Sequence, residues 1–131
     1  QPLLMRLKTD LLDVLEATAE GRLAEVGPLE WDPRPAVCVV MAAEGYPGSY
    51  EKGRPIRGLA EAAALDDVKV FHAGTKMADG QVVTSGGRVL CVVGLGEDVA
   101  TARDVAYAGV AQISWPDHYY RRDIGHRARA R

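Results

Sequence analysis

Cysteine is scarce in this sequence, with two residues among 131. Cys38 and Cys91 each lie inside an apolar run. A small secreted domain held together by disulfides needs more cysteines, and a structural metal site needs them at close spacing. We therefore expect two buried free thiols in a reducing compartment.

Long hydrophobic runs are also missing. No apolar run approaches the roughly 20 residues that a helix needs to cross a bilayer, and the chain does not open with a basic stretch followed by an apolar segment. The net charge is only -2, so the chain as a whole lacks the positive charge that adsorbs to nucleic acids or membrane surfaces. We expect neither a nucleic acid nor a membrane as a partner.

Familiar motifs for catalysis and metal binding are absent as well. The sequence contains no G-x-S-x-G, no H-E-x-x-H and no phosphate-binding P-loop. His72, His118 and His126 lie far apart and show no metal-ligand spacing. Neither cysteine has a neighbouring histidine or cation that would mark a thiolate nucleophile. Taken alone, the chain offers binding chemistry, with no catalytic residue and no metal site.

What is present suffices for one domain with a real core. Hydrophobic residues make up 47% of the chain and charged residues 26%, as in ordinary globular folds. Residues 3–20 carry apolar side chains at spacings of three and four, which predicts a helix that Gly21 ends. Prolines between 28 and 35 cannot continue a helix. We therefore divide the chain into a helical segment, 1–27, and a main body, 28–131.

The main body has the pattern of strands separated by turns. Apolar runs rich in β-branched residues predict the strands, and an apolar face at helical spacing predicts a helix that Asp98 caps. Asp79 and Gly80 favour the tip of a hairpin. The expected elements are strands over 36–42, 68–72, 81–84 and 88–95, one or two helical turns over 59–65, and a helix over 98–113.

The tail, 114–131, is the most unusual stretch, because it carries a net charge of +3 while the rest of the chain carries -5. Arg121 and Arg122 are adjacent, and a guanidinium can bind two oxygens of a phosphate or carboxylate at once. The alternative is a solvated basic terminus, since runs of charge are usually solvated faces. Ile124 and the two tyrosines before the arginines favour packing over full solvation.

A second candidate is the stretch from Ser85 to Arg88. Paired glycines allow backbone amides to approach a ligand closely and to form an anion-binding nest. The alternative for Gly86 and Gly87 is a tight turn between two strands. The sequence alone leaves both interpretations open.

Four motifs in a fixed order carry a resemblance to a known family. They are GYPGSYEKG at 45–53, FHAGT at 71–75, DGQVVTSGGRVLCV at 79–92 and YRRDIGHRA at 120–128. Each motif alone is modest, but the four in this order, followed by a short tail, are specific. The chain closely resembles the C-terminal part of the glycinamide ribonucleotide synthetases (phosphoribosylamine–glycine ligases) of the ATP-grasp superfamily.

The resemblance implies an enzyme that joins glycine to 5-phosphoribosylamine with ATP, in de novo purine synthesis in the cytoplasm. It implies an α+β fold in which 1–27 is the trailing helix of an ATP-grasp core and 28–131 is a small antiparallel β-barrel-like domain with flanking helices. ATP and Mg²⁺ (or Mn²⁺) would be bound mainly by an upstream part of the same protein. The expected partners are that upstream part and the small-molecule substrates, and the chain alone should be inactive.

The role implied for this segment is to close the pocket of the phosphoribosyl substrate. By motif position, Arg121 and Arg122 would grip the phosphate. Asp123 would orient the arginines or accept a hydrogen bond from a ribose hydroxyl. Five further residues complete the expected site: Gly86, Gly87 and Arg88 on the opposite side of the substrate, and Gly48 and Tyr50 at the rim as weaker candidates.

Two other classes of function compete with this one. The chain could be a non-catalytic interaction module of another ATP-grasp ligase or carboxylase, which would require a protein partner. It could also be a basic-tailed RNA binder, because Trp115, Tyr119 and Tyr120 lie near the arginines and could stack on bases. Binding of that kind would fall steeply with salt and would be lost on deletion of 121–131.

Overall fold

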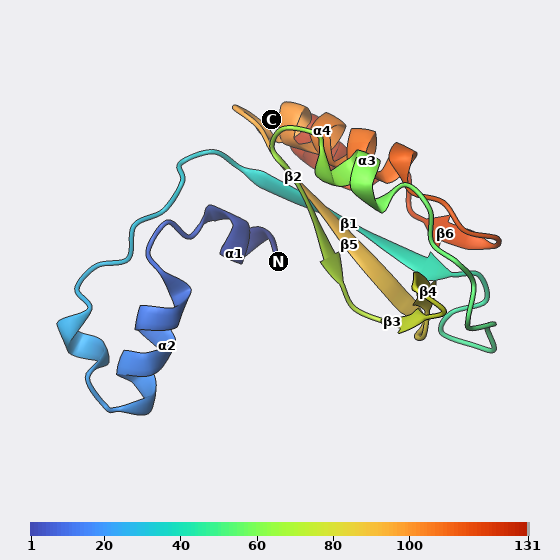
Figure 1. The fold of residues 1–131 in the computed structure, drawn as a ribbon. Coiled ribbons are helices and arrows are strands. Elements are labelled where there is room, and N and C mark those ends of the chain that lie inside the picture. The colour runs from blue at the N-terminus through green and yellow to red at the C-terminus, as the bar shows by residue number, and fades with distance from the viewer. Residues whose placement is uncertain (131) are drawn as a thin grey trace.

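The computed structural model describes residues 1–130, in which two helices cover one face of an antiparallel sheet (Figure 1). Arg131, the last arginine of the basic tail, lies outside the described residues. In chain order the elements are α1 (Pro2–Arg6), α2 (Leu11–Ala19), the 3₁₀ helix η1 (Leu23–Glu25), β1 (Ala36–Ala43), α3 (Leu59–Ala63), β2 (Val68–His72), β3 (Thr75–Ala78), β4 (Gln81–Thr84), β5 (Arg88–Leu95), α4 (Val99–Gln112), β6 (His118–Tyr120) and the 3₁₀ helix η2 (His126–Ala130).

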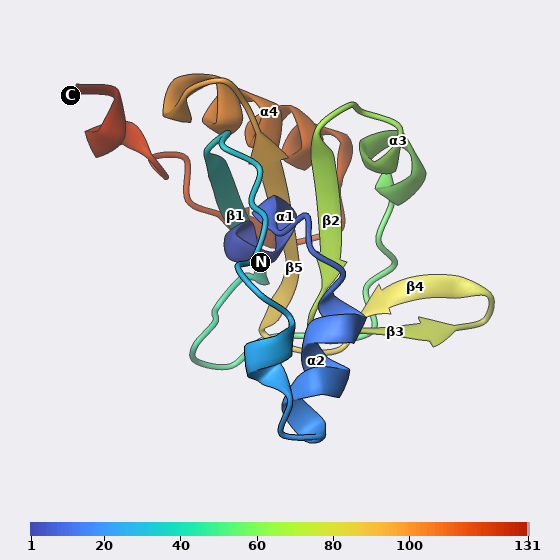
Figure 2. The same cartoon turned by 90° about the vertical axis from the view of Figure 1, so that its left-hand side faces the viewer.

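The four-stranded sheet has the strand order β2-β5-β1-β6, and every neighbouring pair is antiparallel. Side chains alternate between its two faces. On β1, Val39 and Met41 lie in the core beneath α4, whereas Cys38 and Val40 lie on the opposite face. Helices α3 and α4 cover the first face, and α1 lies against part of the second (Figure 2). Much of the second face remains open.

The expected β-barrel-like closure is wrong. The described strands form two separate sheets, the four-stranded one and the β3-β4 hairpin. Strand β6 has only three residues and pairs with Met41, Ala42 and Ala43 at one end of β1. The hairpin pairs with itself and, through an isolated bridge, with Pro55. The edge strands β2 and β6 therefore have no strand between them that could close a barrel. The mixed α+β class itself is correct.

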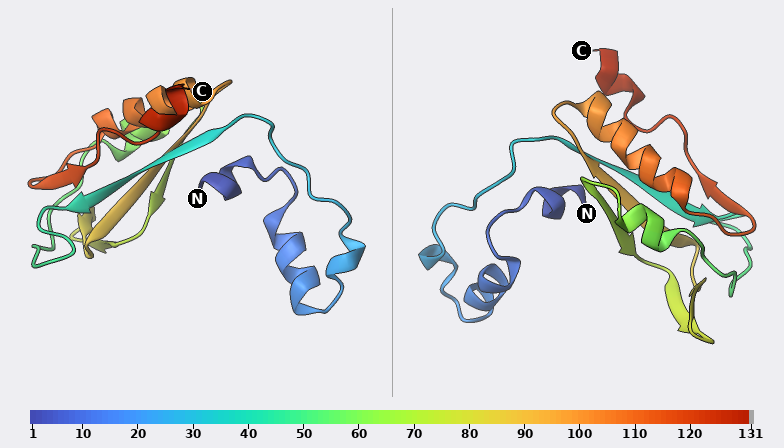
Figure 3. Two further views of the ribbon diagram at one scale, coloured as in Figure 1. Left: turned by 180° about the vertical axis from the view of Figure 1, so that it is seen from behind. Right: turned by 45° about the horizontal axis from the view of Figure 1, so that its top comes forward.

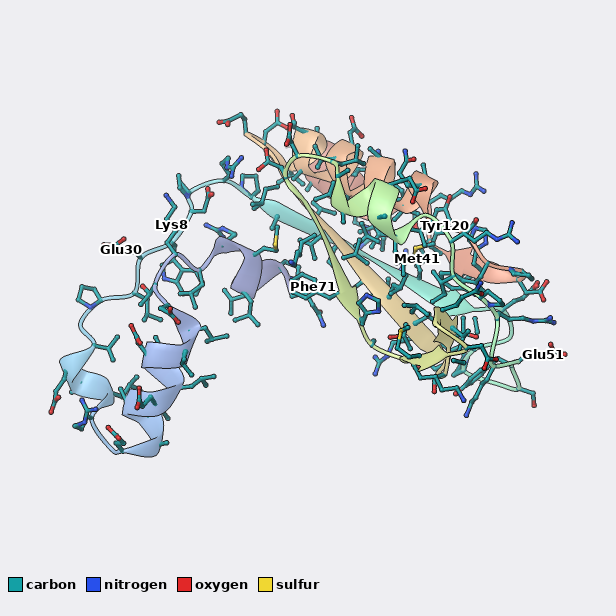
Figure 4. The ribbon with its side chains drawn as sticks, in the orientation of Figure 1. Lys8, Glu30, Met41, Glu51, Phe71 and Tyr120 are labelled. Carbon is teal, nitrogen blue, oxygen red and sulfur yellow. The ribbon has the colours of Figure 1, made fainter. Side chains whose placement is uncertain are left out.

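Helix α4 packs closely on β5 because small residues line the contact. Ala102 and Ala106 are fully buried, and Gly94 of β5 faces both of them. Asp98 caps the helix as expected, with its side chain accepting a hydrogen bond of 2.7 Å from the backbone N–H of Thr101. Figure 4 shows Met41 and Tyr120 side by side at the other end of this core, where β6 joins the sheet.

We expect Asp98→Ala to lower the free energy of unfolding by about 1 kcal/mol, because the first turn of α4 loses its N-cap. Urea denaturation of the purified chain measures this change. Glu97→Ala is the matched control, since it removes an exposed carboxylate one residue earlier and leaves the cap intact. Equal effects of the two substitutions would contradict the capping role.

The single helix expected over 3–20 is wrong, because it breaks into α1 and α2. The backbone of Leu7 is extended and forms a bridge with Trp31, so the chain cannot continue as a helix there. Asp10 then starts a new helix by accepting a hydrogen bond from the N–H of Leu12. The stop at Gly21 is confirmed, since this residue follows the end of α2 with a φ of +72°.

The segment before β1 stands apart from the rest of the molecule. Only α1 lies against the sheet, while α2 projects away from it (Figure 1; Figure 3 from behind). Leu12 and Leu15 of α2 are exposed by 69% and 57%, and Leu3 of α1 by 63%. The division at residue 27 stays a prediction. None of the helices in residues 1–130 is both long and apolar enough to span a bilayer.

Candidate functional site

A cavity of about 290 Å³ opens on the sheet face that α4 does not cover. It lies between β1, the loop that follows β1 and the segment around β6. Its size is near the lower end of small-molecule sites. The lining residues are Cys38, Val40, Ala42, Tyr46, Arg88, Tyr119, Arg121 and Ile124.

The floor of this cavity is apolar because of the alternation along β1. Cys38, Val40 and Ala42 occupy every second position, so all three side chains point away from the core. Tyr119 of β6 pairs with Ala42 in the register of the sheet and therefore lies on the same side. The cavity is thus an apolar floor at the edge of the sheet, with polar groups left to its rim.

Two guanidinium groups line the cavity from different parts of the chain. Arg88 begins β5, next to the glycine pair, and Arg121 follows β6. Arg121 forms a two-pronged ion pair with Asp123, with N···O distances of 2.9 and 2.7 Å. The hydrogen bonds raise the pKa of Arg121 and lower the pKa of the Asp123 carboxyl. Asp123 thus orients one of the arginines, and the structure brings Arg121 and Arg88 to one cavity.

Arg122 does not line the cavity that Arg88 and Arg121 line. Its guanidinium lies 5.7 Å from the ring centroid of Tyr120, at a distance typical of a cation–π contact. It lines a second surface hollow, formed by residues 118–123, which it shares with Arg121. The two adjacent arginines therefore line this second hollow together, and of the two only Arg121 also lines the cavity with Arg88.

The backbone of residues 121–124 is fastened to α4 by two side chains. The hydroxyl of Tyr107 donates a hydrogen bond of 2.6 Å to the carbonyl of Arg121 and accepts one of 3.1 Å from the N–H of Ile124. Arg103 donates to the carbonyls of Ile124 and Arg122 at 3.1 and 3.2 Å. Its guanidinium also lies 4.7 Å from the ring centroid of Tyr107. Figure 3 shows the chain after β6 running back beside α4.

The glycine pair does not line the cavity. Gly86 packs against Gly74, and an added Cβ at Gly86 would lie 3.1 Å from the Cα of Gly74. Gly87 lies beneath the ring of Tyr46, and an added Cβ there would come within 2.1 Å of the ring carbon Cδ2. These contacts are those of a tight junction between strands, and Arg88 is the member of this motif that reaches the cavity.

Gly48 and Tyr50 lie in the loop after β1. Neither lines the cavity shared by Arg88 and Arg121, which we call the arginine cavity. Tyr50 lines another cavity, of about 320 Å³, together with Trp115, Asp117 and Arg54. Gly48 packs against the backbone of Gly45. The loop thus contributes to both cavities, since Tyr50 lines one and Tyr46 lines the other. The two rings pack edge to face, with their centroids 6.1 Å apart.

Both cysteines are free thiols, as expected. Cys91 is buried and Cys38 is half-buried at the cavity floor. Burial raises the pKa of the Cys38 thiol to about 11, and the neighbouring Cys91 adds to the shift. At neutral pH the Cys38 thiol is therefore protonated and a poor nucleophile.

The described residues also contain no cluster that suits a metal ion. Within residues 1–130, no group of three or more His, Cys, Asp or Glu side chains comes together as metal ligands. His72 instead shares a hydrogen bond of 3.0 Å with the hydroxyl of Thr75.

Comparison with known proteins supports the family resemblance that the four sequence motifs indicate. The family model described as "Phosphoribosylglycinamide synthetase, C domain" matches residues 36–127, from the first residue of β1 into η2. The chain belongs to the phosphoribosylglycinamide synthetase C-domain family. Residues 1–35 lie outside the range that the family model matches.

Individual relatives extend over nearly the whole chain. A phosphoribosylamine–glycine ligase from Synechocystis is 58% identical over 98% of the chain, and one from Pseudomonas aeruginosa is 56% identical over 100%. The crystal structure of the phosphoribosylamine–glycine ligase from Thermotoga maritima superposes with a TM-score of 0.68 over 84% of the chain, at 38% identity. The chain spans 30% of each of the two relatives and 27% of the Thermotoga chain.

Three residues of the site are missed by sequence reasoning. Tyr46 lies inside the GYPGSYEKG motif, which stands out as a whole without singling out this ring. Arg103 and Tyr107 are on α4, where a helical pattern marks only the buried face and says nothing about a neighbouring segment. Because both residues are far from the tail in sequence, nothing in a single sequence indicates that they bind it.

Proposed function

We propose that this phosphoribosylglycinamide synthetase C domain is part of an ATP-dependent ligase that joins glycine to 5-phosphoribosylamine, forming glycinamide ribonucleotide. The family match and the names of relatives that are more than half identical support this function. The contribution of the chain is to hold the phosphoribosyl substrate. Such an enzyme works in de novo purine synthesis, in the cytoplasm.

The observation that carries this role is the meeting of Arg88 and Arg121 at one cavity. A sugar phosphate ester is doubly charged near neutral pH, and each of the two guanidiniums can offer it charge-assisted, directional hydrogen bonds. Asp123 holds one of these groups in place beforehand, which reduces the entropy lost on binding. Arg122 would approach the same anion from the adjoining hollow.

The other expected residues have supporting parts in this proposal. Gly86 and Gly87 shape the junction that places Arg88 at the cavity. Gly48 belongs to the loop that carries Tyr50 into the neighbouring cavity. That loop would form the rim of the substrate pocket once the rest of the enzyme covers the open sheet face.

We assign ATP and Mg²⁺ to the part of the protein that precedes this chain, as the family resemblance implies. Residues 1–130 bring together no group of metal-ligating side chains that would hold the ion. Residues 1–27, with their exposed leucines, would pack with that preceding part as the end of an ATP-grasp core. We expect the isolated 131-residue chain neither to hydrolyse ATP nor to form product.

Substitution of the two tail arginines in the full-length enzyme tests the proposal. We expect Arg121→Ala and Arg122→Ala each to raise the KM for phosphoribosylamine by about ten- to a hundredfold, the cost of one charge-assisted contact. The KM for ATP should change far less. Steady-state kinetics with each substrate varied in turn measures both constants, and Lys76→Ala, an exposed cation on β3, is the matched control. An unchanged KM for phosphoribosylamine in both arginine variants would refute the role.

A further inference from the structure

We propose that the ring of Tyr46 is the wall of the arginine cavity on which the sugar of the substrate packs, so that Tyr46 sets the specificity for a ribosyl phosphate over a free phosphate. This inference rests on the proposed function and adds to it. The arginines account for the anionic end of the ligand. The ring of Tyr46 accounts for the contact with the sugar.

The position of Tyr46 is fixed by the glycine beneath it. Gly87 lies so close that any side chain there would overlap the ring, with an added Cβ 2.1 Å from Cδ2 and 2.7 Å from Cε2. Gly87 is also held in place, because its carbonyl accepts a hydrogen bond of 2.8 Å from the N–H of Ala43. The ring therefore rests on a rigid strand junction while it lines the cavity.

The loop itself adds to this restraint. The N–H of Tyr46 donates to the carbonyl of Ala43 at 3.2 Å, which ties the loop to the end of β1. Gly45 has a φ of +87°, and an added Cβ there would lie 2.3 Å from the carbonyl oxygen of Ser49. Tyr50 packs edge to face against Tyr46. An exposed ring restrained in this way is preorganised to receive a ligand.

The chemistry of the cavity matches a ribosyl phosphate. Its floor is formed by Cys38, Val40 and Ala42, so it cannot satisfy a fully polar ligand. The carbon-bound hydrogens of the ribose ring can pack on an aromatic ring with release of water. Arg88 and Arg121 are at the same cavity, within reach of the phosphate on the same small molecule. Inorganic phosphate would use only the arginines.

Calorimetric titration of the full-length enzyme with ribose 5-phosphate and with inorganic phosphate separates these contributions. We expect Tyr46→Leu to weaken ribose 5-phosphate binding about tenfold and to leave phosphate binding unchanged. Tyr46→Phe keeps the ring and is the matched control, so it should bind both ligands as the unchanged protein does.

The Arg121→Ala variant distinguishes this inference from the proposed function. If Arg121→Ala weakens the binding of both ligands while Tyr46→Leu weakens the binding of neither, the role of the ring is overturned and the phosphate site stands. If Tyr46→Leu weakens the binding of both ligands equally, the role of the ring in sugar binding is likewise overturned, since the ring would then act through the arginines. If Arg121→Ala binds both ligands normally, or if the unchanged protein binds no ribose 5-phosphate, the phosphate site and the inference fail together.

Discussion

The Gly94→Val variant should lose most of its folding stability, with a decrease of more than about 4 kcal/mol in the free energy of unfolding. Gly94 is where β5 meets α4. An added Cβ would lie 2.4 Å from the backbone nitrogen of Ala106 and 2.5 Å from the carbonyl oxygen of Ala102. Both are backbone atoms of a helix, so no side chain can rotate away to relieve the overlap.

The loss is expected to be large because α4 cannot shift alone. Ala102 and Ala106 are fully buried in the contact, and Gly96 approaches the helix as closely as Gly94 does. A domain of this size has a total stability of about 5–15 kcal/mol, so the variant would be near its unfolding midpoint or beyond it.

Urea denaturation followed by circular dichroism measures this effect. The control is Gln81→Val, which adds a valine to the exposed face of β4 and should change stability by less than about 0.5 kcal/mol. Similar midpoints for Gly94→Val and the unchanged protein would mean that α4 does not lie on β5 at this distance.

The strands and the main helix could be predicted from the sequence because one physical signal dominates each. The strand at 36–42 is a continuous apolar run, and the structure extends it by one residue to Ala43. The hairpin tip at Asp79 and Gly80 is confirmed, since both residues have the positive φ that a two-residue turn requires. Asp98 caps α4 where the sequence places the start of that helix.

The elements that could not be predicted depend on contacts between distant residues. The break at Leu7 arises from a bridge to Trp31, and nothing in the apolar spacing of residues 3–20 indicates that bridge. Strand β6 is three residues long and has no apolar run of its own, so only its pairing with β1 defines it. The barrel is implied by the family resemblance alone, and the two separate sheets do not form one.

In the candidate site, too, some residues can be found from the sequence and other features are seen only in the structure. Arg88 and Arg121 can be found from the sequence because each belongs to a compact motif with unusual charge or glycine content. The sequence does not indicate that Arg121 reaches the cavity while Arg122 lies over the ring of Tyr120, because that arrangement depends on how the tail packs in the fold. The sequence marks Gly87 for its backbone freedom, yet its contact with the ring of Tyr46 is what the structure adds.

The combined substitution Arg103→Ala and Tyr107→Phe should raise the KM for phosphoribosylamine by roughly a hundredfold in the full-length enzyme, at least as much as Arg121→Ala. The two side chains make four hydrogen bonds to the backbone of residues 121–124. At about 1 kcal/mol for each bond, their loss favours release of this segment by up to about 4 kcal/mol. Release would carry both tail arginines away from the substrate together, whereas Arg121→Ala removes only one.

The effect should be specific to one substrate, because Tyr107→Phe keeps the ring that packs against the core and Arg103 does not belong to that core. Steady-state kinetics should show an unchanged KM for ATP, and thermal unfolding should show that the fold persists. Asp104→Ala is the matched control, since it removes the 2.9 Å ion pair with Arg103 and none of the four bonds to the tail. An equal rise in both KM values would mean that Arg103 and Tyr107 maintain the fold, and no rise at all would mean that the tail holds its position without α4. A selective rise would establish that α4, none of whose residues lines the cavity, positions the arginines for the phosphate.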